Sequence, residues 1–158
     1  MGGVHCEVIP EDFIDENIDY ILGINGMENM AILLDSLKNN RKVQFKHDKI
    51  NKDYQLPMPD RDITSRYRKK YDYAYHVPCA LLKTSFGCPY NCKFCFCVEI
   101  TDHTYFEREL VPVINELKEI KEKNVFIVDD NFLVSRERIK TFCKLLDENN
   151  IQKTFIIF

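Results

Sequence analysis

The segment Cys88-Pro89-Tyr90-Asn91-Cys92-Lys93-Phe94-Cys95 carries three cysteines at the spacing C-x3-C-x2-C. One tight loop of this kind offers three thiolates, which are the soft ligands that iron–sulfur clusters and zinc prefer. Three protein ligands leave a fourth position open, and this suits a cluster whose unique iron must bind another molecule. The segment therefore predicts a cluster-binding loop, and the elements around it indicate the fold that holds the loop.

Apolar strands alternate with amphipathic helices around this loop. The apolar runs predict strands over residues 79–85, 125–128 and 154–158. A helix is predicted over residues 109–123, and Ser135 is expected to cap another helix whose apolar face includes Cys143. This order predicts an α/β fold with a parallel sheet covered by helices.

Polar residues follow the strand predicted over residues 125–128. Asp129, Asp130 and Asn131 come directly after it, as the cysteine loop comes after the strand over residues 79–85. Active sites of parallel barrels gather at the carboxyl ends of the strands, so we expect the two loops to be neighbours. Asp129 or Asp130 could accept a charge-assisted hydrogen bond from an ammonium group. The alternatives are a solvated start of a helix for the aspartates and a turn cap for Asn131.

The N-terminal part predicts a second, smaller α/β unit. Its pattern is a helix over residues 10–16, a buried strand over 19–23, a turn at Asn25-Gly26 and a helix over 27–37. The second helix is expected to bury one face, formed by Met30, Leu33, Leu34 and Leu37. This order fits a parallel sheet, although the strands are too few to complete one.

Residues 39–77 are predicted to connect two domains, which span residues 1–38 and 78–158. The stretch is polar, and its prolines disfavour helix and favour an extended chain. The run Arg66-Tyr67-Arg68-Lys69-Lys70-Tyr71 interleaves cations and aromatic rings, as single-stranded nucleic-acid sites do. Neighbouring acids and the net charge of −3 favour a solvated linker instead, so we expect no nucleic-acid partner.

Composition bounds the class and the location of the protein. The chain has 158 residues, which fits one domain or parts of two, and its longest apolar runs are far shorter than the roughly 18 residues of a membrane span. The N-terminus lacks a basic region followed by an apolar core. Seven cysteines are an odd number to pair, so a reducing compartment with a metal centre fits better than a disulfide framework. We therefore expect a cytoplasmic protein.

The cysteine loop resembles the motif of the radical S-adenosylmethionine (radical SAM) superfamily, in its spacing and in the aromatic Phe94 before the last cysteine. Residues 1–38 resemble the last third of the Rossmann-like cobalamin-binding domain that precedes many radical SAM domains, and Pro59-Asp60-Arg61-Asp62 resembles the linker of this cobalamin-linked subgroup. The resemblance implies that residues 1–38 are the C-terminal part of a Rossmann-like domain. Residues 78–158 would be the first βα units of a partial (β/α)6 radical SAM barrel. Because such a barrel has more units than these, we expect the chain to be a fragment.

The resemblance implies a radical SAM enzyme with a 4Fe-4S cluster held by Cys88, Cys92 and Cys95. S-adenosylmethionine would bind the open iron through its amino and carboxylate groups, with Phe94 beside the adenine. The loop after the next strand holds the methionine amino group in the family, and here that loop is Asp129-Asp130-Asn131. Reductive cleavage would yield a 5′-deoxyadenosyl radical that abstracts hydrogen from a small-molecule substrate, and methyl transfer is among the subgroup's reactions. The electron would come from a reductant such as flavodoxin or ferredoxin.

Cobalamin is the third cofactor that the resemblance implies. The family's Asp-x-His-x-x-Gly motif is absent from this chain, and the turn at residues 23–28 departs from the family's usual Gly-Glu-Gly-Glu. Both departures count against cobalamin binding by this piece. Arg108 resembles an arginine that the subgroup often has after the cysteine loop, and a surface salt bridge is the alternative role.

Two other interpretations of the chain remain open. The first is a small zinc- or iron-binding module without radical chemistry, in which Cys97, Cys79 or His103 would complete the site. Zinc sites usually pair two short Cys/His hairpins, and the sequence shows no second hairpin. The second is an inactive truncated remnant, whose unfinished sheet would expose edges and faces and make it poorly soluble.

Overall fold

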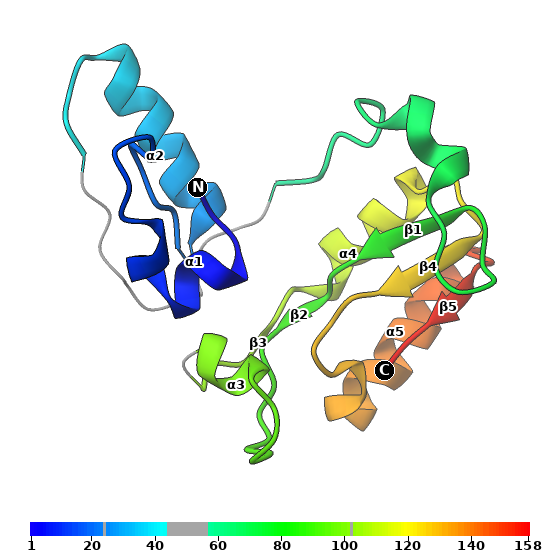
Figure 1. Ribbon diagram of the computed structural model, residues 1–158. Coiled ribbons are helices and arrows are strands. Elements are labelled where there is room, and N and C mark those ends of the chain that lie inside the picture. The colour runs from blue at the N-terminus through cyan, green and yellow to red at the C-terminus, as the bar shows by residue number, and fades with distance from the viewer. Residues whose placement is uncertain (24, 44–56, 102) are drawn as a thin grey trace. The chain divides into compact units, whose positions relative to one another are not determined.

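The chain folds into two compact units in a computed structural model, which describes residues 1–23, 25–43, 57–101 and 103–158 (Figure 1). Unit 1 comprises residues 1–55 and 91–104, and unit 2 comprises residues 56–90 and 105–158. The cysteine loop passes from unit 2 into unit 1 between Tyr90 and Asn91. The expected domain division at residues 1–38, 39–77 and 78–158 stays a prediction.

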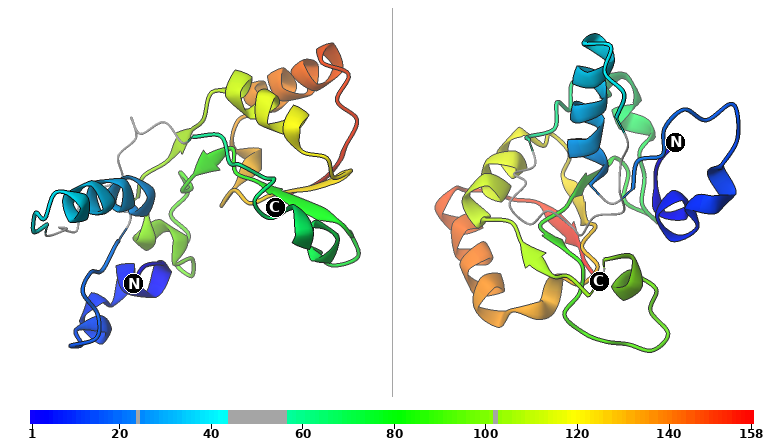
Figure 2. Two further views of the ribbon diagram at one scale, coloured as in Figure 1. Left: turned by 90° about the horizontal axis from the view of Figure 1, so that it is seen from above. Right: turned by 90° about the vertical axis from the view of Figure 1, so that its left-hand side faces the viewer.

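Unit 2 contains a parallel sheet of three strands in the order β1-β4-β5 (Figure 1). The strands are β1 (Cys79–Leu82), β4 (Asn124–Ile127) and β5 (Thr154–Ile156). In the register, Ala80 lies opposite Val125, and Val125 lies opposite Phe155. Two helices lie on one face of the sheet, α4 (Leu110–Glu119) and α5 (Arg136–Glu148) (Figure 1; Figure 2). The predicted α/β fold with a parallel, helix-covered sheet is confirmed, whereas the barrel stays a prediction.

The core of unit 2 lies between the sheet and these two helices. Its most deeply buried apolar side chains, each at most 1% exposed, are Leu82, Val113, Leu117, Val125 and Ile127. On α5 the ring of Phe142 is buried in this core, but Cys143 is exposed, so the prediction of an apolar-face position for Cys143 is wrong. One residue along a helix turns the side chain by about 100°, which carries Cys143 away from the sheet.

The helix ends follow the local sequence. The Ser135 side chain accepts a hydrogen bond from Arg138 N at 3.2 Å, which confirms the predicted N-cap of α5. The helix α4 ends at Glu119, earlier than the predicted residue 123. Ile120 has an extended backbone, with φ of −70° and ψ of 117°, and buries its side chain in the core instead.

The opposite face of the sheet is partly covered by aromatic rings. Tyr73 stacks on Phe126 of β4 with ring centroids 4.1 Å apart, and Phe158 lies edge-on to both rings. Leu81 of β1 stays 55% exposed. Parallel strands are usually buried on both faces, so Tyr73 supplies part of a cover that the helices do not. The segment directly before β1 therefore belongs to the packing of unit 2.

The outer edge of β1 is capped by two arginines that share one buried glutamate. Leu82 O accepts a hydrogen bond from the β4 side, so the carbonyl groups of Leu81 and Lys83 point to the outer edge. Arg61 Nη2 donates to Leu81 O at 2.9 Å, and Arg108 Nη1 donates to Lys83 O at 2.5 Å. The two guanidinium groups contact the carboxylate of Glu116 at 2.6 and 2.8 Å, and the Glu116 side chain is only 4% exposed. These arginines satisfy edge carbonyls that a neighbouring strand would otherwise pair.

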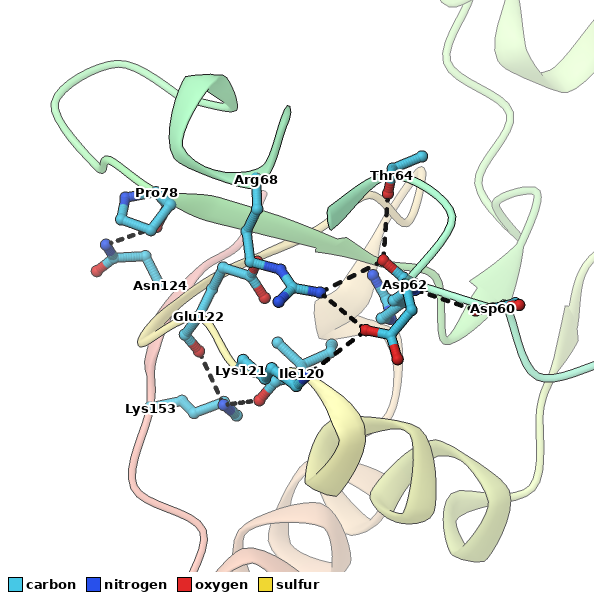
Figure 3. A network of polar contacts seen from close by, with 11 residues as sticks. Asp60, Asp62, Thr64, Arg68, Pro78, Ile120, Lys121, Glu122, Asn124 and Lys153 are labelled. Atoms are coloured by element: carbon cyan, nitrogen blue, oxygen red, sulfur yellow. Dashed lines mark hydrogen bonds and ion pairs between the residues drawn. The ribbon is translucent and has the colours of Figure 1, made fainter. Parts of the chain in front are cut away.

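Ion pairs also hold the segment before β1 (Figure 3). This segment contains a 3-10 helix, η2 (Ser65–Lys70), which interrupts the extended chain predicted there. Arg68 Nε lies 2.7 Å from Glu122 Oε1, and the Glu122 side chain is 7% exposed. Lys153 Nζ donates to the backbone carbonyls of Ile120 and Glu122 at 2.7 and 2.8 Å, as Figure 3 shows. Arg68 is therefore neutralised within unit 2, while the absence of a nucleic-acid partner stays a prediction.

Unit 1 is mainly helical in its described residues. Its helices are α1 (Val4–Val8), η1 (Pro10–Phe13), α2 (Gly26–Lys38) and α3 (Cys97–Ile100). The prediction of a strand over residues 19–23 is wrong, because Leu22 forms a single parallel bridge with Gly2. The helix predicted over residues 27–37 is confirmed as α2. Of its expected apolar face only Leu33 is buried, because the described part of unit 1 contains no sheet to cover the rest.

Across the part of the chain that the structure describes, no helix has the length and apolar character needed to cross a membrane. The expected cytoplasmic location stays a prediction.

Replacing Glu116 by glutamine is expected to lower the free energy of unfolding by about 3 kcal/mol, because two partly buried guanidinium groups would lose their shared carboxylate. Urea denaturation followed by circular dichroism measures this loss. Glu119→Gln, at an exposed position of the same helix, is the matched control and should change the free energy by less than about 0.5 kcal/mol. Similar losses in the two variants would contradict the role of Glu116.

Candidate cofactor-binding loop

The cysteine loop leaves unit 2 through a short antiparallel pair beyond the carboxyl end of β1. Its strands are β2 (Ser85–Phe86) and β3 (Phe106–Glu107), and the rings of Phe86 and Phe106 stack with centroids 4.8 Å apart. Gly87 follows with a φ of 71°, a backbone conformation that favours glycine. The chain therefore turns directly before Cys88, the first cysteine of the loop.

Asp129 fastens the end of β1 to the end of β4. Its side chain accepts hydrogen bonds from Thr84 N at 2.6 Å, Thr84 Oγ1 at 2.5 Å and Ser85 Oγ at 2.9 Å. Asp129 is 7% exposed, and Thr84 and Ser85 are at most 2% exposed. Both carboxylate oxygens of Asp129 are therefore engaged by buried donors of unit 2.

Asp130 pairs with Lys83 and holds the residue before Cys88. Asp130 Oδ2 accepts a hydrogen bond from Gly87 N at 2.9 Å and lies 3.7 Å from Lys83 Nζ. Lys83 also donates to Val128 O at 3.2 Å. The pair places a cation and an anion together at the carboxyl end of the sheet.

Asn131 contacts the first cysteine itself. Its Oδ1 accepts a hydrogen bond from Leu133 N at 3.0 Å, which confirms the turn cap that the sequence offered as an alternative role. Its Nδ2 lies 4.0 Å from Cys88 Sγ, within reach of a hydrogen bond to sulfur. Asp129, Asp130 and Asn131 therefore hold three successive points of the segment that leads into the loop. The two loops predicted to be neighbours are in contact here.

The three cysteines of the loop are free thiols. Cys92 is exposed and Cys88 and Cys95 are half-buried, and Cys95 N donates to Cys92 O at 3.0 Å in a tight turn. Cys88 belongs to unit 2, whereas Cys92 and Cys95 belong to unit 1. Among residues 1–23, 25–43, 57–101 and 103–158, no group of three or more His, Cys, Asp and Glu side chains is arranged to hold a metal ion.

The donor set of the loop fits an iron–sulfur cluster by its chemistry. Three thiols within eight residues, none of them in a disulfide, supply only soft sulfur ligands. Phe94 lies between the second and third thiol and is 92% exposed, so its ring is available to a ligand. The fit rests on the kind of donors that the loop supplies and on their accessibility.

The other cysteines differ from these three in their surroundings. Cys79 lies in β1 and is 3% exposed, and burial raises the pKa of its thiol. Cys79 begins β1, whereas the cysteine loop follows the carboxyl end of the same strand, so Cys79 is poorly placed as a fourth zinc ligand. Cys97 is half-buried at the start of α3, and His103 is exposed. Cys6 is buried in unit 1.

Arg138 supports the loop from the side of α5. Its Nη2 donates to Thr84 O at 3.1 Å and to Arg108 O at 2.7 Å, and its Nη1 lies 3.5 Å from Glu107 Oε2. Glu107 also accepts a hydrogen bond from Tyr105 OH at 2.7 Å. Burial and this hydrogen bond raise the pKa of Tyr105 well above its usual value. Arg108 makes a salt bridge, as the alternative role proposed, but with a buried glutamate rather than at the surface.

Glu116 and Arg138 were not predicted from the sequence, although each carries a signal. Glu116 lies three residues after Val113 and four before Ile120, inside the apolar stripe of α4. Arg138 lies four residues before Phe142 and shares its side of α5. A charged residue at a core position of a helix indicates a buried ion pair, because such groups are almost never fully buried unless paired.

Asp129→Ala is expected to lower the free energy of unfolding by about 3 kcal/mol, because three buried donors would lose their acceptor. Urea denaturation measures the change. Asp147→Ala, at an exposed position of α5, is the control and should remain within about 0.5 kcal/mol of the wild type. If Asp129→Ala behaved like its control, the carboxylate would not be holding the two strand ends.

Stability is expected to fall as the pH rises through the ordinary pKa of tyrosine, about 10. The pKa of Tyr105 is raised in the folded state, so the folded chain keeps the phenol proton when the unfolded chain releases it. The contribution of Tyr105 to the free energy of unfolding is therefore complete below the pKa of the unfolded chain and is lost as the pH rises above it. Urea denaturation at about pH 8 and about pH 11 should show that the free energy of unfolding falls less for Tyr105→Phe than for the wild type between these two pH values. Tyr75→Phe, at a residue that is 99% exposed, should retain the wild-type fall, and equal falls in all three proteins would refute this assignment.

Comparison with known proteins relates the chain to methyltransferases. It is 23% identical over 171 aligned residues to the hopanoid C-3 methylase of Methylococcus capsulatus, covering 99% of this chain and 33% of that protein. An uncharacterized methyltransferase of Pyrococcus horikoshii is 30% identical over 160 residues, which cover 87% of this chain and 34% of that protein. An uncharacterized methyltransferase of Synechocystis is 22% identical over 152 residues, which cover 92% of this chain and 27% of that protein. No family model and no solved structure matches, and the chain spans about a third of the length of these curated relatives.

Proposed function

We propose that the chain is part of a radical SAM methyltransferase, in which Cys88, Cys92 and Cys95 hold a 4Fe-4S cluster. The observation that carries the proposal is the place of the loop, because three free thiols follow the carboxyl end of a parallel strand. Similarity to proteins named as a methylase and as methyltransferases supports methyl transfer as the reaction. When bound, such a cluster supplies the electron for reductive cleavage of S-adenosylmethionine.

The residues after β4 would divide the work of holding the ligands. Asp129 is engaged on both oxygens by buried donors, so we assign the methionine ammonium to Asp130. The ammonium group of Lys83 lies beside Asp130 and would pair with the carboxylate group of S-adenosylmethionine. The exposed ring of Phe94 would stack on the adenine. Asn131 would act on the cysteine loop rather than on the nucleoside.

The remaining partners follow from the same proposal. A flavodoxin or a ferredoxin would deliver the electron, and the methyl acceptor would be a small molecule in the cytoplasm. We assign no cobalamin ligand to this chain, because the Asp-x-His-x-x-Gly motif is absent from it.

Anaerobic reconstitution of the chain with iron and sulfide, followed by reduction with dithionite, is expected to give the electron paramagnetic resonance signal of a 4Fe-4S cluster. Adding S-adenosylmethionine should change the signal, because the open coordination position would be filled. Cys92→Ala should abolish the signal, since the loop would retain two of its three thiols. Cys143→Ala, which removes an exposed thiol of α5, is the matched control and should keep it.

The other outcomes separate the alternatives. Bound zinc in place of iron, in a protein indifferent to S-adenosylmethionine, would favour the metal-binding module without radical chemistry. A cluster that forms but ignores S-adenosylmethionine would contradict its binding by this chain. Loss of the signal in both cysteine variants would contradict the assignment of the three ligands.

A further inference from the structure

Asn131 is held so that its amide hydrogens face the first cysteine of the loop. Its side chain has two different ends, a carbonyl oxygen that only accepts and an NH2 group that only donates. The oxygen is occupied by Leu133 N at 3.0 Å, and this fixes which end is which. The nitrogen therefore faces Cys88 Sγ, at 4.0 Å. Sulfur at this place receives a hydrogen-bond donor from the neighbouring loop.

The surrounding contacts hold this geometry in place. Asp130 fixes Gly87 N at 2.9 Å, so the backbone directly before Cys88 is tied to the residue directly before Asn131. Asp129 ties Thr84 and Ser85 to the same loop. Both partners of the amide–sulfur contact therefore come from segments that unit 2 fixes independently of the contact itself.

We propose that Asn131 is a positioning residue that donates an N–H···S hydrogen bond to Cys88 and thereby raises the reduction potential of the cluster. The inference rests on the proposed function, because it takes Cys88 as a cluster ligand. Reduction adds one electron, here from dithionite, and its negative charge is shared by the cysteine sulfurs. A donor at one of these sulfurs stabilises the reduced form more than the oxidised form, and hydrogen bonds to sulfur are among the factors that set such potentials.

Asn131→Ser separates this role from the turn cap. Serine keeps an oxygen that can accept from Leu133 N and adds no charge, but it is too short to reach Cys88 from the same backbone position. In a redox titration of the reconstituted chain, the ratio of reduced to oxidised cluster at a fixed potential should fall about tenfold, which is 59 mV for a one-electron couple. Asn115→Ser, at an exposed position of α4, should leave the midpoint unchanged.

A second measurement needs no cluster. In the cluster-free chain, the nuclear magnetic resonance signals of the Asn131 side-chain NH2 group, identified by their loss in Asn131→Ser, should shift in Cys88→Ala. They should stay in place in Cys143→Ala.

The possible results distinguish the inference from the function on which it rests. If the wild-type chain assembles no cluster, both fall. If the cluster assembles and Asn131→Ser has the wild-type midpoint, the tuning role is overturned while the proposed function stands. If the NH2 signals ignore Cys88→Ala, the contact itself is overturned. A midpoint lowered in Asn131→Ser alone, together with shifted NH2 signals in Cys88→Ala, supports the inference.

Discussion

The buried carboxylate of Asp129 is the interaction on which the position of the cysteine loop depends. Backbone hydrogen bonds align parallel strands only along their paired length, so the segments beyond the strands need side chains to hold them. Asp129 receives two hydrogen bonds from Thr84 and one from Ser85, and it does so in the core, where a lost partner is costly. Asp130 and Asn131 extend the attachment to Gly87 and Cys88. The loop thus begins from a fixed point of the sheet.

A different constraint acts along the outer edge of β1. This strand pairs with β4 on one side, and on the other its carbonyl groups meet guanidinium groups instead of a strand. A single carboxylate, that of Glu116, holds both Arg61 and Arg108 in place. Because Arg61 precedes β1 and Arg108 follows the loop, segments from both sides of the cysteines depend on the same buried charge. The outward carbonyl groups at this edge already have hydrogen-bond donors, which discourages pairing with a strand of another chain.

The parallel sheet, its two helices and the place of the loop could be predicted from the sequence, because each depends on the local spacing of apolar residues. The strand predicted over residues 19–23 is wrong, because a strand also needs a neighbouring strand with which to pair. In the described part of unit 1, Leu22 forms only a single bridge, with Gly2. The contacts of Asp129 were equally out of reach. They depend on the register between β1 and β4, which pairs residues about 45 positions apart. The order of strands and loops along the sequence predicted that the two loops would be neighbours. Only the register of the strands shows which atoms of the loops are in contact.

The three consecutive attachments after β4 also limit how the chain can vary in length. Each of Asp129, Asp130 and Asn131 meets its own partner on the other loop. A point substitution therefore removes one attachment and leaves two. An insertion or deletion of one residue between Ile127 and Asp129 would instead move all three side chains away from their partners at once, because the register of β1 and β4 fixes where the stretch begins. This short stretch tolerates a change of side chain far better than a change of length, whereas most surface loops accept both.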